Sequence, residues 1–132
     1  MSLLSNIRAE VAASIAVKQA LLEDETLLTQ AEALARQCVE ALRAGSKIIF
    51  AGNGGSFADA QHLSAEFVSR FKFDRAPLAS LTLGTNNSAI SAIGNDYGYD
   101  QVFHVSWKLS PRKATCSSAS VPAATARIFL LP

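Results

Sequence analysis

The sequence predicts an α/β domain with a parallel sheet, preceded by two long helices. Two short apolar runs, "KIIFAG" (residues 47–52) and "LASLTLG" (residues 78–84), have the composition of buried strands. A helical pattern follows each run, at about Ser56–Phe71 and Asn87–Asp96. Because strands and helices alternate over short connections, we expect the strands to pair in parallel through right-handed crossovers.

Two amphipathic helices are expected in residues 1–45. In the first helix, apolar residues recur every three to four positions, at Leu4, Ile7, Val11, Ile15 and Leu22. The same period runs from Leu27 to Leu42, and Gly45 stands where a left-handed C-terminal cap is expected. A small sheet cannot cover both faces of such a pair. We therefore expect this helical pair to serve oligomerisation by packing against other subunits.

Length and charge limit the classes of function. The chain has 132 residues, 17% of them charged, and a formal net charge of +1, so we expect one domain with neither nucleic acid nor a membrane as partner. A small neutral ligand or a phosphorylated metabolite fits better. Cys38 and Cys116 form no metal-binding or disulfide pattern, and no apolar run approaches the roughly 20 residues of a membrane span. A cytoplasmic location is expected.

A glycine-rich loop, Gly52-Asn53-Gly54-Gly55-Ser56, joins the first strand to its helix. Glycines allow close backbone approach, and the helix that follows offers unpaired N–H groups, so an anion fits here. The loop lacks the spacing of the dinucleotide fingerprint and the ending of a Walker loop. The alternative interpretation is a tight turn with Ser56 as the helix cap.

Four polar residues follow the helical period after this loop: Asp59, His62, Glu66 and Arg70. The opposite side is expected to carry small residues such as Ala58 and Ala65. A histidine and a glutamate four residues apart can both reach one metal ion or one substrate carbon, and the carboxylate can act as a general base. The alternative is an ordinary pair on a solvated helix face.

A third polar cluster, "TNNS" (residues 85–88), follows the second strand, and Asp96 lies in a Gly-Asn-Asp segment. These residues can bind hydroxyl groups, but helix capping by Asn87 and a turn at Gly98 also explain them. From Val105 onward neither period is sustained, so this part is expected to be loop or tail. His104 and Trp107 receive no role.

Taken together, "AGNGGSFADAQHLSAEFVSRF" and "LTLGTNNSAISAIGNDYGYDQVF" resemble the sugar isomerase (SIS) family, and more narrowly its sedoheptulose 7-phosphate (phosphoheptose) isomerases. The resemblance covers about residues 1–103. It implies a parallel-sheet, Rossmann-like αβα fold, with residues 46–103 as the first part of the SIS domain. The family forms homotetramers.

The resemblance also implies an activity and a site. Family members convert D-sedoheptulose 7-phosphate to D-glycero-D-manno-heptose 7-phosphate, an early step towards lipopolysaccharide or other surface glycans. Glu66 matches their catalytic base, and some members bind zinc through the residues that match His62 and Glu66, with two further ligands from later in the chain. Substrate binding is implied for the positions Asn53, Gly54, Gly55, Ser56, Arg70, Asn95 and Asp96.

Two other functions are compatible with this resemblance. One is the non-enzymatic SIS scaffold that binds the bacterial replication initiator as a tetramer and keeps much of the same pattern. The other is an isomerase of a different phosphosugar, such as arabinose 5-phosphate. Turnover of sedoheptulose 7-phosphate by the intact protein separates these alternatives.

The resemblance stops after Phe103, and residues 104–132 are interpreted as an aberrant tail. Members of the family continue with a strand and a phosphate-binding loop of the form "GDVLIGISTSGNSPN". Joining the third base of each codon from Lys113 onward to the first two bases of the next allows "GDVLIGISTSGNSP" to be read from "KATCSSASVPAATAR", and the first two bases of the Ile128 codon allow the final Asn. We therefore expect a frameshift near His104, with the C-terminal half of the SIS domain missing and the chain inactive as it stands.

The nucleotide sequence from the codon of Asp100 to that of Lys113 tests this interpretation. A gene that continues into the loop in frame with Phe103 encodes a full-length isomerase with Glu66 as base. A shift that is present in the gene makes this chain the product of an interrupted gene, whose site residues bind substrate weakly or not at all. Codons that spell the loop in no frame would contradict the interpretation.

Overall fold

A computed structural model describes residues 2–108 and 127–131 of the protein. The chain divides into two compact units, residues 1–36 and residues 37–132. Each unit is described by itself below. The second unit contains the sheet, the glycine loop and every predicted site residue.

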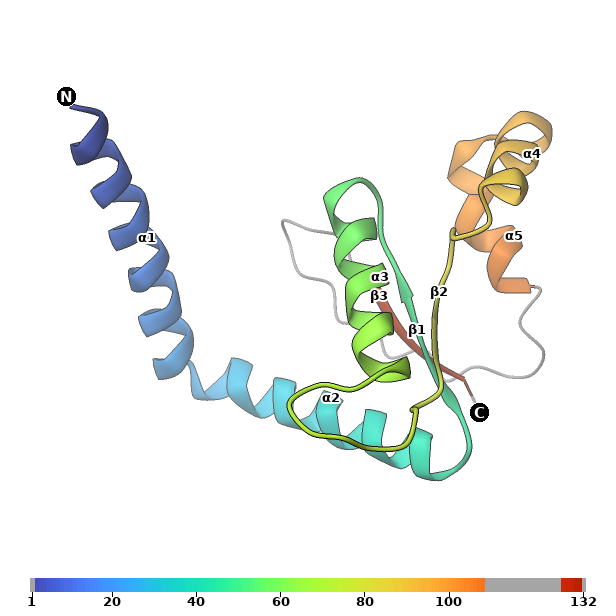
Figure 1. Cartoon of the computed structure of the whole chain (residues 1–132), viewed down its shortest axis with the longest axis horizontal. Helices are drawn as coiled ribbons and strands as arrows, with labels where there is room; N and C mark the ends of the chain where they lie inside the picture. The colour runs from blue at the N-terminus through green and yellow to red at the C-terminus, as the bar shows by residue number, and fades with distance from the viewer. Residues whose placement is uncertain (1, 109–126, 132) are drawn as a thin grey trace. The chain divides into compact units, whose positions relative to one another are not determined.

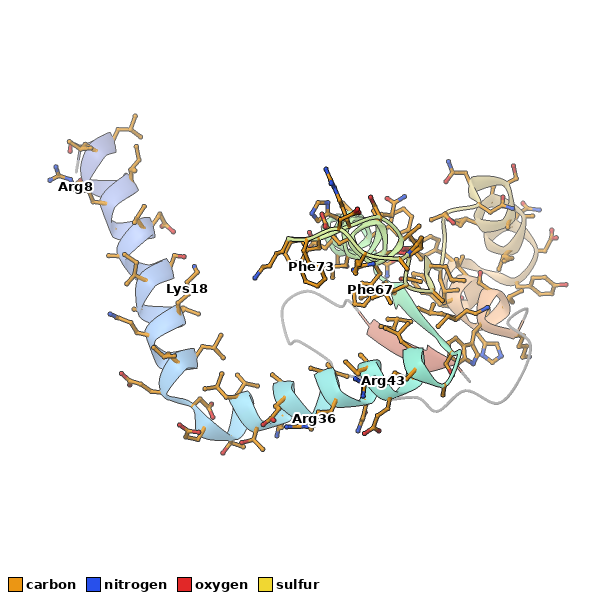
Figure 2. All side chains as sticks on the ribbon, turned by 60° about the horizontal axis from the view of Figure 1, so that its bottom comes forward. Arg8, Lys18, Arg36, Arg43, Phe67 and Phe73 are labelled. Carbon is orange, nitrogen blue, oxygen red and sulfur yellow. The ribbon has the colours of Figure 1, made fainter. Side chains whose placement is uncertain are left out.

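The first unit consists of helix α1 (Leu3–Glu23) and the beginning of helix α2 (Glu25–Arg43). Both starts are capped, because the Ser2 hydroxyl accepts a hydrogen bond from the Ser5 amide (3.1 Å) and the Asp24 carboxylate accepts one from the Leu27 amide (2.9 Å). No residue of α1 is buried. Charged side chains such as Arg8 and Lys18 project from this helix (Figure 2), and its apolar stripe is exposed as well.

The sheet of the second unit has three strands in the order β2-β1-β3 (Figure 1). Strands β1 (Lys47–Ala51) and β2 (Ser80–Thr82) are parallel, which confirms the predicted pairing. Strand β3 (Arg127–Leu131) pairs antiparallel with β1 over the whole of β1. The interpretation of residues 127–131 as loop or tail is therefore wrong, since the short run "RIFLL" finds backbone partners on the open edge of β1.

Strand β1 is buried on both faces, as the central strand of a sheet between helices should be. On one face, Ile48 and Phe50 pack with Ala60 of helix α3 and with apolar residues at the end of α2. On the other face, Ile49 and Ala51 pack with Leu83 and with the partly buried rings of Phe103 and Trp107. The Cys38 thiol of α2 packs against Ile48, Phe50 and Ala60, and this burial raises the pKa of the thiol.

Residues 102–108 form helix α5 (Val102–Lys108), so the expectation of loop from Val105 onward is wrong for residues 105–108. The helix follows a short 3₁₀ turn, η1 (Tyr99–Gln101). One full turn of α5 suffices to bring Trp107 onto the sheet next to Phe103, and this contact stabilises a segment whose sequence has no sustained helical period.

Helix α3 (Gly55–Val68) ends three residues before its predicted end, because the backbone of Ser69 leaves the helical conformation with φ −93° and ψ −128°. Its buried positions are Ser56, Ala60 and Ser64, whereas Ala58 and Ala65, expected on the packed side, are exposed. The buried face is thus polar in part, and it is bonded to strand β2. The Thr82 hydroxyl donates to the Ala60 carbonyl and the Ser80 hydroxyl to the Ser64 hydroxyl, both at 3.0 Å.

Helix α4 (Asn87–Tyr97) follows β2, and Gly98 ends it with φ 93° as the turn prediction requires. Its cap is Asn86, whose side-chain oxygen accepts a hydrogen bond from the Ala89 amide (3.1 Å). The assignment of the cap to Asn87 was off by one residue. Of the residues of α4, Ile93 is buried and anchors the helix.

Candidate functional site

The site lies where the parallel strands β1 and β2 end. The glycine loop connects β1 to α3, and the segment from Leu83 to Asn86 connects β2 to α4. Because the two strands are parallel neighbours, both connections emerge at the same edge of the sheet. This edge is where ligands bind in open α/β folds.

Two glycines of the loop are required by its geometry. A Cβ atom on Gly52 would lie 2.8 Å from the backbone nitrogen of Phe57 and closer still to the carbonyl of Ser56, so only glycine lets the helix start so close to the strand. Gly54 has φ 55°, a conformation that favours glycine, and it forms the N-cap of α3 without a side-chain hydrogen bond. Gly55 has open space around it and no such requirement.

Ser56 closes the loop instead of capping the helix. Its hydroxyl donates to the Asn53 carbonyl (2.8 Å) and accepts from the Asn53 amide (2.9 Å), and the side chain is buried. The interpretation of Ser56 as the helix cap is therefore wrong, although the tight turn of the same interpretation is present. Within the described residues, the amides of Gly54 and Gly55 have no hydrogen-bond partner. These two amides are available to an anion.

A small hollow of about 70 Å³ opens beside the loop, well below the roughly 300–1,000 Å³ of most small-molecule sites. Asn53 and Gly54 are the predicted site residues that line it. The other lining residues come from the turns after both strands, from helices α3 and α4, and from the segment after α4: Gly52, Phe57, Gly84, Ile90, Tyr99, Val102 and Phe103. The wall is mostly apolar, and its polar groups belong to Asn53 and Tyr99.

Tyr99 is a site residue that the sequence did not reveal. Its hydroxyl donates to the side-chain oxygen of Asn53 over 3.1 Å, joining residues 46 positions apart in the chain. With its oxygen engaged in this way, Asn53 keeps its amide N–H groups for a ligand. The only signal was an aromatic residue directly after Gly98, which has no spacing relation to the glycine loop.

His62 and Glu66 form a pair one turn apart on α3, with 3.5 Å between His62 Nε2 and Glu66 Oε1. The two side chains differ in environment, since the imidazole is 76% exposed and the carboxylate only 30%. A half-buried carboxylate is better suited to proton transfer than one on a fully solvated face. The predicted polar stripe ends here, because Arg70 lies beyond the end of the helix and is exposed.

The pair fits half of a zinc site. Two ligands at about 2.0–2.2 Å from a tetrahedral zinc ion lie roughly 3.3–3.5 Å apart, which the two facing atoms match. Zinc sites need three or four protein ligands, however. Across residues 2–108 and 127–131, no group of three or more histidine, cysteine, aspartate or glutamate side chains could hold a metal ion. The remaining ligands would have to come from outside this part of the chain.

Two other predicted substrate-binding residues lie on the last turns of α4. Asn95 donates from its side-chain nitrogen to the Asp96 carboxylate over 3.0 Å, and both residues are exposed. Neither lines the hollow. The structure therefore brings Asn53, Gly54 and Gly55 together at the loop and pairs His62 with Glu66. It does not bring Arg70, Asn95 or Asp96 to the hollow.

Comparison with known proteins agrees with this geometry. The family model of the SIS domain matches residues 11–114. The chain belongs to the SIS domain family. The SIS fold is also present in solved structures of phosphoheptose isomerases. One, from Francisella tularensis, superposes with a TM-score of 0.74 at 29% identity over 86% of this chain and 58% of that one. Another, from Neisseria gonorrhoeae, gives 0.68 at 39% identity over 84% and 56%.

The curated relatives of this chain are also named phosphoheptose isomerases. The phosphoheptose isomerase of Aneurinibacillus thermoaerophilus is 54% identical over 97 residues, which are 74% of this chain and 49% of the relative. Phosphoheptose isomerase 2 of Campylobacter jejuni is 50% identical over 99 residues, 75% of this chain and 49% of the relative. The chain thus spans about half the length of the curated relatives that it matches.

Replacing Gly52 with alanine tests the geometry of the loop. We expect Gly52→Ala to lower the free energy of unfolding by about 1–3 kcal/mol, because the new methyl group meets the backbone of Ser56 and Phe57. Gly55→Ala is the matched control and should leave stability unchanged or raise it by up to about 1 kcal/mol. Urea unfolding measures both variants. Equal stability of the two would contradict this description of the loop.

Proposed function

We propose that the protein of which this chain is part is a phosphosugar isomerase, and that its substrate is sedoheptulose 7-phosphate. The observation that carries the proposal is the Glu66 carboxylate, half-buried beside His62 on the helix that starts at the glycine loop. The names of the SIS relatives support the heptose phosphate as substrate class and disfavour the scaffold alternative.

The reaction moves one proton between neighbouring carbons. Glu66 would remove the proton from C1 of the ketose, giving an enediol, and would return a proton to C2, so that the carbonyl group passes from C2 to C1. The hydroxyl proton moves from O1 to O2 in the same process. No net oxidation occurs and no co-reactant is needed.

The glycine loop would bind oxygen atoms of the substrate. The amides of Gly54 and Gly55, which have no partner among the described residues, and the side-chain amide of Asn53 are hydrogen-bond donors on one short loop, and donors of this kind stabilise negative charge on oxygen. The hollow is too small for a heptose phosphate. Completion of the site would therefore need further parts of the full-length enzyme, consistent with relatives about twice as long. Arg70, Asn95, Asp96 and Ser56 remain proposed substrate-binding positions.

We further propose zinc as a metal that His62 and Glu66 can hold in the complete enzyme. Zinc would supply positive charge that stabilises the developing oxyanion. A place in the cytoplasm and in heptose biosynthesis for lipopolysaccharide or a related glycan follows from the proposed substrate. None of the helices in the described part of the chain combines the length and the apolar composition that a membrane span needs.

We propose a homotetramer, because the resemblance to the family implies four subunits and α1 carries an exposed apolar stripe that can form a subunit interface. The side chains of this stripe are between 52% and 72% exposed, at Leu4, Ile7, Val11, Ile15 and Leu22. An apolar stripe of such length on one helix face is typical of a subunit interface.

Turnover tests the proposed activity. A form of the protein extended with the rest of the SIS domain should isomerise sedoheptulose 7-phosphate, whereas the 132-residue chain should not. In the active form, Glu66→Gln should lower kcat by about 10²- to 10⁴-fold because the base is lost. Asp59→Asn, the control on an exposed position of the same helix, should retain kcat. Activity of Glu66→Gln equal to wild type would overturn the assignment, and zinc content is measured on the same preparations.

The mass of the chain in solution tests the tetramer. We expect light scattering to give the mass of four chains of 14.0 kDa each. Val11→Asp should reduce this mass, since it places a charge in the apolar stripe. Ala13→Asp adds the same charge on the opposite face of α1 and should leave the assembly intact. A single-chain mass for the wild type would refute the proposal.

A further inference from the structure

The end of helix α3 needs hydrogen-bond donors from elsewhere in the chain. The last four carbonyl groups of a helix have no partner within it, and an unsupported last turn frays. Glu66 belongs to this last turn, because α3 ends at Val68. The Ser69 amide satisfies the Ala65 carbonyl over 2.8 Å, which leaves the carbonyls of Glu66, Phe67 and Val68, the first two of which lie next to the Glu66 side chain in sequence.

Arg75 supplies donors to the carbonyls of Glu66 and Phe67. From the loop after α3, its guanidinium donates to the Glu66 carbonyl (2.6 Å), the Phe67 carbonyl (2.9 Å) and the Ala76 carbonyl (3.0 Å). The Leu78 amide donates to the Phe67 carbonyl as well (3.0 Å). Arg75 is partly buried. A charged donor near a helix C-terminus also interacts favourably with the helix dipole.

Two contacts stabilise the last turn of α3: the hydrogen bonds of the Arg75 guanidinium and the packing of the Phe67 ring. Phe67 packs against the core and contacts the Phe50 ring, with 5.8 Å between the ring centroids, so it anchors the turn to the sheet. Phe67 alone does not satisfy the carbonyl of Glu66. The Arg75 guanidinium satisfies this carbonyl, and it also joins the helix end to the segment that leads into β2.

The loop that carries Arg75 has a strained tip. Lys72 has φ 64°, unfavourable for a residue with a side chain, and the Phe73 amide donates to the Phe71 carbonyl over 2.8 Å. Strain of this kind persists only where surrounding contacts over-determine the backbone. The hydrogen bonds from Arg75 to Glu66 and Phe67 close this loop at its base and are such contacts.

We propose that Arg75 is a positioning residue for Glu66. It keeps the last turn of α3 wound, so that the Glu66 carboxylate stays opposite His62 and half-shielded from water. Arg75 acts through the backbone and does not touch the reacting atoms. The catalytic meaning of this role rests on the proposed isomerase function, whereas the positioning itself can be measured on the 132-residue chain.

Two measurements by NMR test the proposal. The first is hydrogen exchange of the amides from Glu66 to Ser69, with the amides of the middle of α3 as internal reference. The second is broadening of the His62 ring signals by Co²⁺ alone, compared with the ring of His104, the other histidine of the chain. In the wild type, Co²⁺ should broaden His62 first because Glu66 offers a second ligand, and Glu66→Gln should remove this preference.

Arg75→Gln should speed exchange at Glu66–Ser69 by about tenfold and leave the middle of α3 unchanged. It should also reduce the preference of Co²⁺ for His62 by about threefold or more, and the loss should not add to that of Glu66→Gln. Arg75→Lys should restore both properties in part, since an ammonium group donates to fewer carbonyls in fixed geometry. Ile93→Ala, which removes buried side-chain volume in α4, controls for a general loss of stability.

Three results would overturn the proposal. They are a wild-type chain without preference for His62, an Arg75→Gln variant that retains the preference, and an Ile93→Ala variant that loses it equally. None of these readouts involves turnover. If the protein is not an isomerase, the hydrogen-exchange and Co²⁺ results are still expected. If Arg75 does not position Glu66, the turnover of the extended protein still tests the isomerase assignment by itself.

Discussion

Burial of β1 on both faces is the constraint on which the second unit depends. Ile48 and Ile49 are adjacent in sequence, point to opposite faces, and are both almost completely buried. A strand that is apolar on both faces must have helices on both sides. Helices α2 and α3 cover one face and α5 covers the other, so the positions of the helices follow from the composition of five residues.

The glycine loop converts this packing into a site. Since β1 and α3 are both held against the core, the chain must turn between them within a few residues. The absence of a Cβ at Gly52 and the reciprocal hydrogen bonds of Ser56 and Asn53 make the turn compact. One result is that the amides of Gly54 and Gly55, at the start of α3, have no hydrogen-bond partner among the described residues. Another is that the helix carries Glu66 away from the loop, to the end that Arg75 and Phe67 hold.

Periodicity and composition predicted the elements whose local signal agrees with their environment. The two N-terminal helices, the parallel strands and the helices after each strand were all recognised from apolar spacing. The errors lie where tertiary contacts outweigh local preference. Helix α5 forms because Phe103 and Trp107 reach the sheet. Helix α3 ends early because the backbone of Ser69 leaves the helical conformation, and Arg75 then satisfies the carbonyls of Glu66 and Phe67. The buried serines of α3 could not be foreseen, since their partners are on β2.

The residues of the site were likewise predicted only where they are close together in the sequence. The loop and the pair of His62 and Glu66 were visible because their spacing is local. Tyr99 was not, because its contact with Asn53 spans 46 positions and depends on how the chain folds between them. The exposed position Asn95 was implied by family resemblance alone and Asp96 also by its polar Gly-Asn-Asp segment, but neither residue lines the hollow.

Strand β3 has a consequence for how the chain behaves among its own copies. It pairs with every residue of β1, so the backbone donors and acceptors along that edge of the central strand are used internally. An unpaired apolar edge is a template for aggregation between chains. The outer edges of the described sheet are instead β2, with three residues, and β3, with five. Intermolecular strand addition thus has only short segments on which to begin.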